Sequence, residues 1–456
     1  METQNILKTA ALTGGIGVLT ERVARAEAQA AQATRGMPAP KIEDVRVIAT
    51  QPAAARLTVV KVITDQDGLY GYGCGTLTTR AELVNIAVER YLKPFLVGKP
   101  ADRIDDIWQA CYNSSYWRNG PVLNNALSGV DQALWDIKGR QAGMPVYDLL
   151  GGKCREAAEC YVHINGGDYP QLIDEARRFI EQGFRTVRLQ ANVPGMANYT
   201  GAGVFGSSGS TDVAPVRGLH EGGVFESAPS MRRGLKCLEE CRKQLGDEIG
   251  LIYDVHERLT PNETVQFAKD VEPLKLFFLE DSLSPEDIAY FRQIRQQCCT
   301  PLAMGELFTS PHEWTPLISE RLIDYMRMHI SDMGGLTPAR KVAAMGEIMG
   351  VKTAWHGPGD VSPIGHAAQL HLDLACYNFG IQEYTPFNDR AREVFKGCPE
   401  VKNGYMYAND APGWGMEVDE KMAAKYPYGI HDQGEQKKLN GSFGEIRRRD
   451  GSIIKL

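Results

Sequence analysis

The pattern of hydrophobic and polar residues divides the chain into regions of different periodicity. Three short apolar runs, VRVIAT, RLTVVKVITD and LYGYGCGTL, lie between residues 41 and 77. Such runs predict β-strands, and the DQDG turn between the last two favours an antiparallel hairpin. From residue 81 to residue 150 apolar residues recur at helical spacing, ending at Gly143 and Pro145. We therefore expect an α+β domain at residues 41–157.

Strand-like and helical patterns then alternate over residues 158–390. Eight apolar runs are separated by helical stretches: ECYVHI, TVRLQ, LIYDVH, LFFLED, PLAMGE, YMRMHI, KTAWHG and GIQEY. This alternation is typical of an α/β fold, and eight parallel strands are enough to close a TIM-type barrel. Residues 191–230 are rich in Gly and Ser and predict a long loop at the mouth of the barrel. Residues 391–456 cannot add another unit, so we expect them to pack back on the first domain.

Composition and charge exclude several classes of protein. A net charge of −7 and a pI near 5.8 argue against nucleic-acid binding, which needs a concentrated basic patch. The ten cysteines include no CxxC pair, which disfavours structural zinc, and their arrangement is unlike a secreted disulfide framework. No window holds 18 consecutive apolar residues, so no membrane span is expected.

Residues 1–40 form an N-terminal extension that we leave out of the fold argument. The run ILKTAALTGGIGVLT and the Ala-rich ARAEAQAAQA after it are similar to the hydrophobic part of a twin-arginine export signal, although the arginine pair is missing. We slightly favour a cytoplasmic location, with export as the alternative.

Three carboxylates, Asp254, Glu280 and Glu306, follow successive strands at equal intervals. Any one of them could be a helix cap or a surface ion-pair partner. In a barrel, however, the carboxyl ends of the strands meet on one face, so the three side chains converge. Converging carboxylates repel one another unless a cation compensates them, and oxygen ligands suit Mg²⁺. An ion held there can bind a substrate carboxylate and favour loss of the adjacent proton.

Other polar residues also follow the predicted strands. His256 comes two residues after Asp254 and is a candidate general acid or base. Arg188 ends the second strand, where it would lower the pKa of a nearby base or pair with an anion. The turn HGPGDVSP contains Asp360, which could cap the next helix or contact the substrate. The last three strands end at candidate substrate-binding residues, namely His329, His356 and Glu383.

Long strings of the sequence resemble one known family. They include YWRNGPVLNNALSGVDQALWDIKGRQAGMPVYDLLGG, YDVHERLTP, FLEDSLSP and AWHGPGDVSP, and over residues 41–430 the chain resembles the mannonate dehydratase family of the enolase superfamily. The resemblance implies a modified (β/α)7β TIM-type barrel with an α+β N-terminal capping domain. It also implies a homo-oligomer with one Mg²⁺ per subunit. The implied reaction dehydrates a sugar acid of the D-mannonate or D-gluconate type to a 2-keto-3-deoxy sugar acid, through an enediolate.

The resemblance also assigns roles to individual residues. Asp254, Glu280 and Glu306 match the metal ligands, and His256 matches the general acid. Tyr199 is the best match for the base, assisted by Arg188, although the interval between the two is one residue shorter than usual. His356 and Glu383 match substrate-binding positions of the family, and Arg258 lies in the same matched block. Three further residues are candidates for substrate binding without such a match: Asp360, His329, where related enzymes often carry other residues, and Arg56, which stands where the family has an asparagine.

Two alternatives remain open at this point. One is epimerisation or racemisation at C2 of a hydroxy acid, which needs a base on each face of the enediolate, with His356 as the candidate second base. The other is a sugar-acid-binding homologue with little or no turnover. The arginine at position 56, in place of the family's asparagine, is compatible with this alternative.

Overall fold

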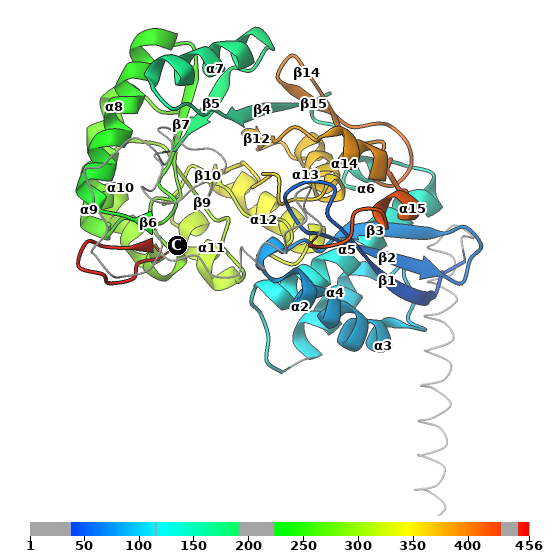
Figure 1. The fold of residues 1–456 in the computed structure, drawn as a ribbon. Helices are drawn as coiled ribbons and strands as arrows, with labels where there is room; N and C mark the ends of the chain where they lie inside the picture. The colour runs from blue at the N-terminus through cyan, green and yellow to red at the C-terminus, as the bar shows by residue number, and fades with distance from the viewer. Residues whose placement is uncertain (1–37, 115, 191–222, 430–445, 456) are drawn as a thin grey trace, which may run out of the picture.

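A barrel and a smaller capping domain lie side by side in the computed structural model (Figure 1). The model describes residues 38–114, 116–190, 223–429 and 446–455. The expectations for the N-terminal extension, for most of the Gly/Ser-rich loop and for Tyr199 fall outside these ranges. No helix within them has the length and apolar character that a bilayer crossing needs.

The capping domain begins with a three-stranded antiparallel sheet, in the order β1 (Ile42–Thr50), β2 (Leu57–Thr64) and β3 (Tyr70–Cys74). The backbone N–H of Thr64 donates to the carbonyl of Leu69 at 3.1 Å and closes the DQDG turn. The predicted hairpin is therefore confirmed. The helices of this domain follow as α2 (Ala81–Ala87), η2 (Val88–Leu92), α3 (Lys93–Leu96), α4 (Ile104–Ser114), α5 (Pro121–Ala142) and α6 (Val146–Leu149).

Helix α5 packs directly on β3. It starts with Pro121 at its first position and ends before Gly143, which adopts a left-handed conformation that glycine tolerates well. The strand carries Gly71 and Gly73 where it meets the helix. A Cβ atom added at Gly73 would lie 2.0 Å from the carbonyl oxygen of Gly129. Glycine at this position thus allows backbone-to-backbone contact between sheet and helix.

Eight short parallel strands form the barrel, and they match the eight predicted runs. They are β4 (Ala158–His163), β5 (Thr186–Leu189), β7 (Gly250–Asp254), β8 (Phe278–Glu280), β9 (Leu302–Met304), β10 (Tyr325–Met326), β11 (Lys352–Thr353) and β12 (Gln382–Glu383). The strands pair in that order, and β12 pairs with β4. A parallel bridge from Thr353 to Phe379 joins β11 to the residues before β12. The barrel is therefore closed.

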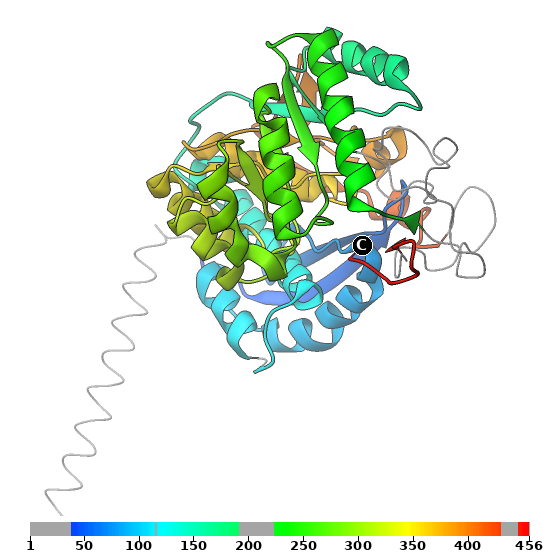
Figure 2. The ribbon, with the colours of Figure 1, turned by 90° about the vertical axis from the view of Figure 1, so that its left-hand side faces the viewer.

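Seven helices separate these strands in the described part of the chain and cover the outside of the barrel (Figure 2). They are α7 (Tyr169–Glu181), α8 (Ser227–Leu245), α9 (Pro261–Val271), α10 (Phe291–Gln297), α11 (Pro311–Ser319), α12 (Leu336–Met349) and α13 (Pro363–Ala375). Three 3₁₀ turns accompany the helices: η1 (Thr78–Arg80) in the cap, η3 (Glu272–Leu274) directly after α9, and η4 (Pro285–Tyr290) directly before α10. The (β/α)7β architecture is thus present. One local expectation was wrong: Ser362, not Asp360, caps α13, because its hydroxyl accepts from the N–H of Gly365.

The segment after β12 reaches both domains. It contains α14 (Asp389–Val394), β13 (Phe395–Lys396), β14 (Glu400–Lys402), β15 (Tyr405–Tyr407), β16 (Glu417–Val418) and α15 (Glu420–Ala423). Strand β15 pairs antiparallel with β4. On the capping domain, the indole of Trp414 donates to the carbonyl of Tyr72 at 2.9 Å, and Glu420 pairs with Lys61 at 2.6 Å. Further on, β17 (Ile446–Arg447) pairs with β6 (Gly223–Val224) before α8.

We expect Gly73→Ala to lower the free energy of unfolding by about 1–3 kcal/mol, because the new methyl group forces β3 and α5 apart. Chemical denaturation followed by circular dichroism measures this change. Gly359→Ala is the control, since its added Cβ would lie 3.5 Å from Thr385, an ordinary contact. Equal stability of the two variants would contradict the proposed close packing.

Candidate active site

The three predicted carboxylates lie together at the carboxyl ends of the barrel strands. Asp254 and Glu280 are the last residues of β7 and β8 and pair directly in the sheet register. Glu306 lies two residues beyond β9. Their exposed fractions are 1%, 0% and 8%. Two residues earlier on the same strands, Ile252 and Phe278 belong to a buried cluster built from the barrel strands, whereas Tyr253 and Leu279 belong to the cluster shared with the helices. The alternation along the strands therefore places Asp254 and Glu280 on the inner side, at the mouth.

The carboxylate oxygens form two adjoining groups. In one group, ligand atoms of Asp254, Glu280 and Asp281 lie within 4.8 Å of one another, and in the other those of Glu257, Asp281 and Glu306 do so. The predicted three residues are therefore divided between two groups that share Asp281. The sequence reasoning missed Asp281 and Glu257, although each directly follows a residue that it had singled out.

Two buried arginines lie between these carboxylates. Arg188, on β5 as predicted, forms an ion pair with Asp254 and approaches Glu280 at 3.2 Å. Arg327, just after β10, lies 3.1 Å from Glu280 and also pairs with Glu306. The sequence reasoning did not identify Arg327. Arg327 stands two residues before His329, and side chains two residues apart on a strand lie on the same face. This spacing was the signal in the sequence that could have placed Arg327 at the site.

Negative charge exceeds positive charge among the buried ionisable side chains at the mouth. Six buried carboxylates face the two guanidinium groups: Asp254, Glu257, Glu280, Asp281, Glu306 and Glu383. Burial raises the pKa of Glu280 to about 8 and that of Asp281 well above its ordinary value. Burial also acts to raise the pKa of Glu306, but the charges of His356 and Arg327 hold it below its usual range. An additional cation would stabilise the ionised forms.

Glu280 provides the clearest evidence that the mouth fits a metal ion. Both of its carboxylate oxygens are buried, and one lies 3.2 Å from Arg188 and the other 3.1 Å from Arg327. Neither contact has hydrogen-bond geometry, so among the described residues the two oxygens have ion-pair partners and no hydrogen-bond donor. Buried acceptors without a hydrogen bond are unusual, and oxygen atoms of this kind are the ligands that Mg²⁺ prefers. Asp254, Glu280, Asp281 and Glu306 could therefore hold a hard divalent cation.

His256 reaches this cluster through a turn. Strand β7 ends at Asp254, and the backbone at His256 is left-handed, with φ of 59°. Its N–H donates to Asp254 at 2.8 Å, and its Nε2 lies 3.6 Å from Glu306. His256 therefore lies near the predicted metal ligands, as expected. A turn places it there, whereas we had expected the alternation of side chains along a strand to do so. Burial lowers the pKa of His256 to about 4.

His329 and His356 form a pair beside the other carboxylate oxygen of Glu306. Their Nδ1 atoms lie 2.6 Å apart, so one ring donates to the other, and Nε2 of His356 lies 3.4 Å from Glu306. Asp360 belongs to the same group of possible ligands. Burial lowers the pKa of His329 and raises that of Asp360.

Glu383 connects this side of the mouth to the first strand. One of its oxygens lies 2.5 Å from His163 Nε2, and the other accepts from Arg327 at 2.5 Å and from the N–H of Gly357 at 2.8 Å. His163 ends β4 and was missed, although it stands at a strand end like the histidines that were identified. Burial and the neighbouring Arg188 lower its pKa.

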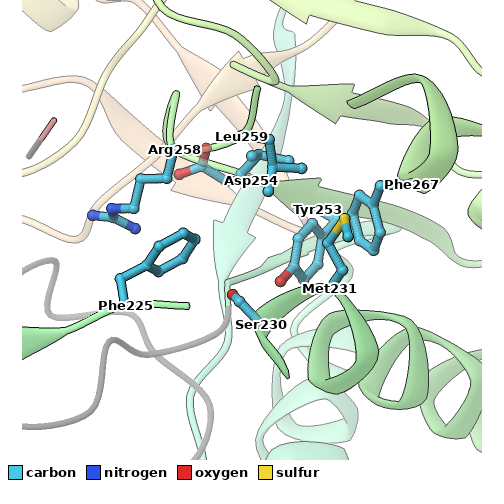
Figure 3. A pocket seen from close by; sticks show the side chains of 9 residues that line it. Phe225, Ser230, Met231, Tyr253, Asp254, Arg258, Leu259 and Phe267 are labelled. Atoms are coloured by element: carbon cyan, nitrogen blue, oxygen red, sulfur yellow. The ribbon is translucent and has the colours of Figure 1, made fainter. Parts of the chain in front are cut away.

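A small pocket opens beside Asp254. Arg258 lines it and donates to His256 at 3.0 Å. Figure 3 shows Arg258 and Phe225 on one side of Asp254, and Tyr253, Met231 and Phe267 on the other. Arg258 is thus adjacent to the carboxylate cluster, as expected.

Arg56 lies in the capping domain, where its guanidinium is 3.9 Å from Glu82. Within the described ranges, no ion pair or hydrogen bond joins Arg56 to the carboxylates of the barrel. A direct role for it at the site therefore remains a prediction from the sequence. The same holds for Tyr199, which lies outside the described residues.

Comparisons with known proteins identify close relatives. The chain matches the model described as Enolase C-terminal domain-like over residues 171–422, and the Mandelate racemase / muconate lactonizing enzyme, N-terminal domain, over residues 30–151. It is 50% identical over 392 residues to D-galactonate dehydratase family members of Musicola paradisiaca and Salmonella enteritidis, covering 85% of this chain and 94% of each relative. The crystal structure of an enolase from Pantoea ananatis with bound D-gluconate and Mg is similar, with a TM-score of 0.84 and 46% identity, covering 91% of this chain and 99% of that one.

We expect Glu280→Gln to weaken binding of a divalent cation at least about tenfold, because it removes a charged oxygen ligand from the cluster. Titration of metal-free protein with Mn²⁺, followed by electron paramagnetic resonance, measures this affinity. Glu286→Gln is the matched control, since Glu286 is 72% exposed and pairs with Lys455. Unchanged affinity of Glu280→Gln would remove this carboxylate from the set of ligands.

Proposed function

Because this chain belongs to the D-galactonate dehydratase family of the enolase superfamily, we propose that it removes water from a sugar acid. The product would be a 2-keto-3-deoxy sugar acid. The observation that carries the proposal is the buried group of carboxylates at the barrel mouth, where neither oxygen of Glu280 has a hydrogen-bond partner in the described part of the chain. Such a group fits Mg²⁺, which, when bound, would neutralise a substrate carboxylate and make the adjacent carbon more acidic.

The residues around the cluster would move the protons. Tyr199 is the proposed base that takes the proton from C2, with Arg188 lowering the pKa of its hydroxyl. His256 would protonate the departing 3-hydroxyl. Its pKa near 4 makes the imidazole neutral at pH 7 in the free protein, so the acid role requires the negative charge of the bound substrate to raise that pKa.

The remaining polar residues would orient the sugar chain. His329, His356 and Asp360 present ring nitrogens and a carboxylate on one side of Glu306, and Arg258 lines the pocket on the other. Neutral imidazoles can both donate to and accept from hydroxyl groups. Burial keeps His329 neutral at ordinary pH, so it suits the hydroxyls of a polyol better than an anion.

We propose an aldonic acid with a six-carbon chain as the substrate. The relatives are named for D-galactonate, the similar crystal structure contains D-gluconate, and several motifs resemble mannonate dehydratases. The three acids differ only in the configuration of hydroxyl groups. Arg56 in place of an asparagine supports a preference other than D-mannonate, because a long cation and a short amide bind different groups.

Epimerisation at C2 is the second candidate reaction, because His356 could act as a base on the other face. Its Nδ1, however, contacts His329 at 2.6 Å, and its Nε2 lies 3.4 Å from Glu306. Both ring nitrogens are thus engaged within the cluster, and this favours dehydration.

We expect the protein with Mg²⁺ to form a 2-keto-3-deoxy acid from at least one of D-gluconate, D-galactonate and D-mannonate, and chelation to abolish turnover reversibly. A semicarbazide assay for the keto group measures the product across a panel of aldonic and uronic acids. Binding without product for every acid would support a binding protein and contradict the proposal.

We expect His256→Asn to lose dehydration by at least about 100-fold, the scale of a general acid's contribution, while C2 proton exchange with solvent continues. Tyr199→Phe should stop both, because it removes the base. Proton NMR in deuterated water follows exchange and keto-acid formation together. Loss of exchange in His256→Asn would instead make this histidine the base, and epimer formation without water loss would identify an epimerase.

A further inference from the structure

The turn that leads from β10 into α12 is compact and internally bonded. We call residues 329–335 the DMGG turn, after Asp332, Met333, Gly334 and Gly335. Backbone hydrogen bonds close it from Met333 to His329 at 3.1 Å and from Gly335 to Ile330 at 2.8 Å. Both glycines have positive φ, of 99° and 107°. A displacement of one part of such a turn therefore moves the rest.

The capping domain holds the DMGG turn at several points. The indole of Trp108 donates to the carbonyl of Gly334 at 2.8 Å, and Asn124 donates to the carbonyl of Asp332 at 2.7 Å. Next to the turn, the N–H of Thr337 donates to Asp131 at 2.9 Å. These contacts involve the backbone of the barrel domain, so they set where the turn lies. The hydroxyl of Ser331, within the turn, also donates to the carbonyl of Cys74 on β3 at 3.2 Å.

One contact differs because it joins two side chains. Asn125 of α5 donates to the carboxylate of Asp332, and the same amide donates to the carbonyl of Pro121 at 2.8 Å. Asn125 is fully buried and Asp332 is 8% exposed. Burial raises the pKa of Asp332 to about 7, the charges of Asp360 and Glu306 act in the same direction, and the hydrogen bond from Asn125 acts against them. Asn125 therefore favours the ionised form of Asp332 and holds its side chain in place.

The other end of the DMGG turn is part of the site. His329 begins the turn and contacts His356 at 2.6 Å between the Nδ1 atoms, and His356 lies 3.4 Å from Glu306. The path from the capping domain to the cluster thus runs through Asn125, Asp332 and the histidine pair, and each step is a direct contact or the closed turn itself. No residue of the long Gly/Ser-rich loop is needed for it.

We propose that Asn125 is a positioning residue, which holds Asp332 and thereby fixes the DMGG turn and the orientation of His329 against His356. The inference rests on the proposed dehydratase function, since its effect is on turnover. It gives the capping domain a part in the alignment of the barrel's own histidines, in addition to covering the mouth. It also accounts for the DMGG motif as the place where the two domains are joined.

The test compares three variants of the full-length protein with Mg²⁺ present. Asn125→Asp places a second carboxylate against Asp332 and should lower kcat by about tenfold, a coupling typical of residues in contact, with less change in KM. Asp332→Asn alone measures how much kcat changes when the charge at position 332 is lost. The exchange Asn125→Asp with Asp332→Asn restores an amide–carboxylate hydrogen bond in the reverse direction, and we expect it to recover most of the kcat lost in Asn125→Asp.

Val130→Ala provides the control for stability. Val130 lies fully buried on the same helix, in the apolar core of the capping domain. We expect it to lower the unfolding temperature as Asn125→Ala does, because it leaves a cavity in that core, while kcat stays unchanged. If Asn125→Asp does not fold, Asn125→Ala takes its place in the comparison with Val130→Ala.

The outcomes separate this inference from the proposed function. A wild-type protein that dehydrates no sugar acid would overturn the proposed function, and the inference with it. An active wild type with kcat unchanged in Asn125→Asp or Asn125→Ala would overturn the inference alone. The inference would also fail if the double variant, Asn125→Asp with Asp332→Asn, had a kcat no higher than the sum of the two single-variant effects predicts.

Discussion

The compensation of buried negative charge at the barrel mouth is the constraint on which the rest of the structure depends. Carboxylates withdrawn from water are strongly destabilising unless cations face them. Arg188 and Arg327 supply that charge from β5 and from the residue after β10. Each arginine contacts carboxylates from different strands, so the barrel must close in one register for the ion pairs to form. The chemistry that we propose uses the same excess of negative charge.

The barrel does not hold this arrangement by itself. The capping domain reaches over to the loops after β9 and β10 through α5, a helix whose buried face is rich in polar side chains. Asn124 alone donates to the carbonyls of Thr309 and Asp332, which belong to two different barrel loops. The mouth is thus a composite in which ionisable groups come from the barrel and much of the restraint on its loops comes from the cap. This division explains how loops with little regular structure can keep defined positions.

Most of the fold could be predicted from the sequence, because strand and helix periodicities are strong and the polar residues at strand ends are conspicuous. The site was predictable only in part. Arg327 and His163 lie inside or at the end of runs that the apolar pattern assigns to strands, and the pattern carries no information about which charged side chains meet. The division of the carboxylates around Asp281 depends on side-chain directions. The left-handed turn at His256 and the cap by Ser362 depend on local backbone geometry, which a periodicity does not specify.

The contacts of Trp414 with the capping domain can form only late in the synthesis of the chain. Its N–H and indole bond to Asp136 and Tyr72, which precede it by 278 and 342 residues. At ribosomal speeds of about 5–20 residues per second, Asp136 and Tyr72 are synthesised roughly 14–70 s before this tryptophan. During that interval the nascent domain lacks a cover that its sheet and α5 both use. The capping domain is therefore completed only late in translation. Chaperones that shield apolar surface would act on this early part of the chain.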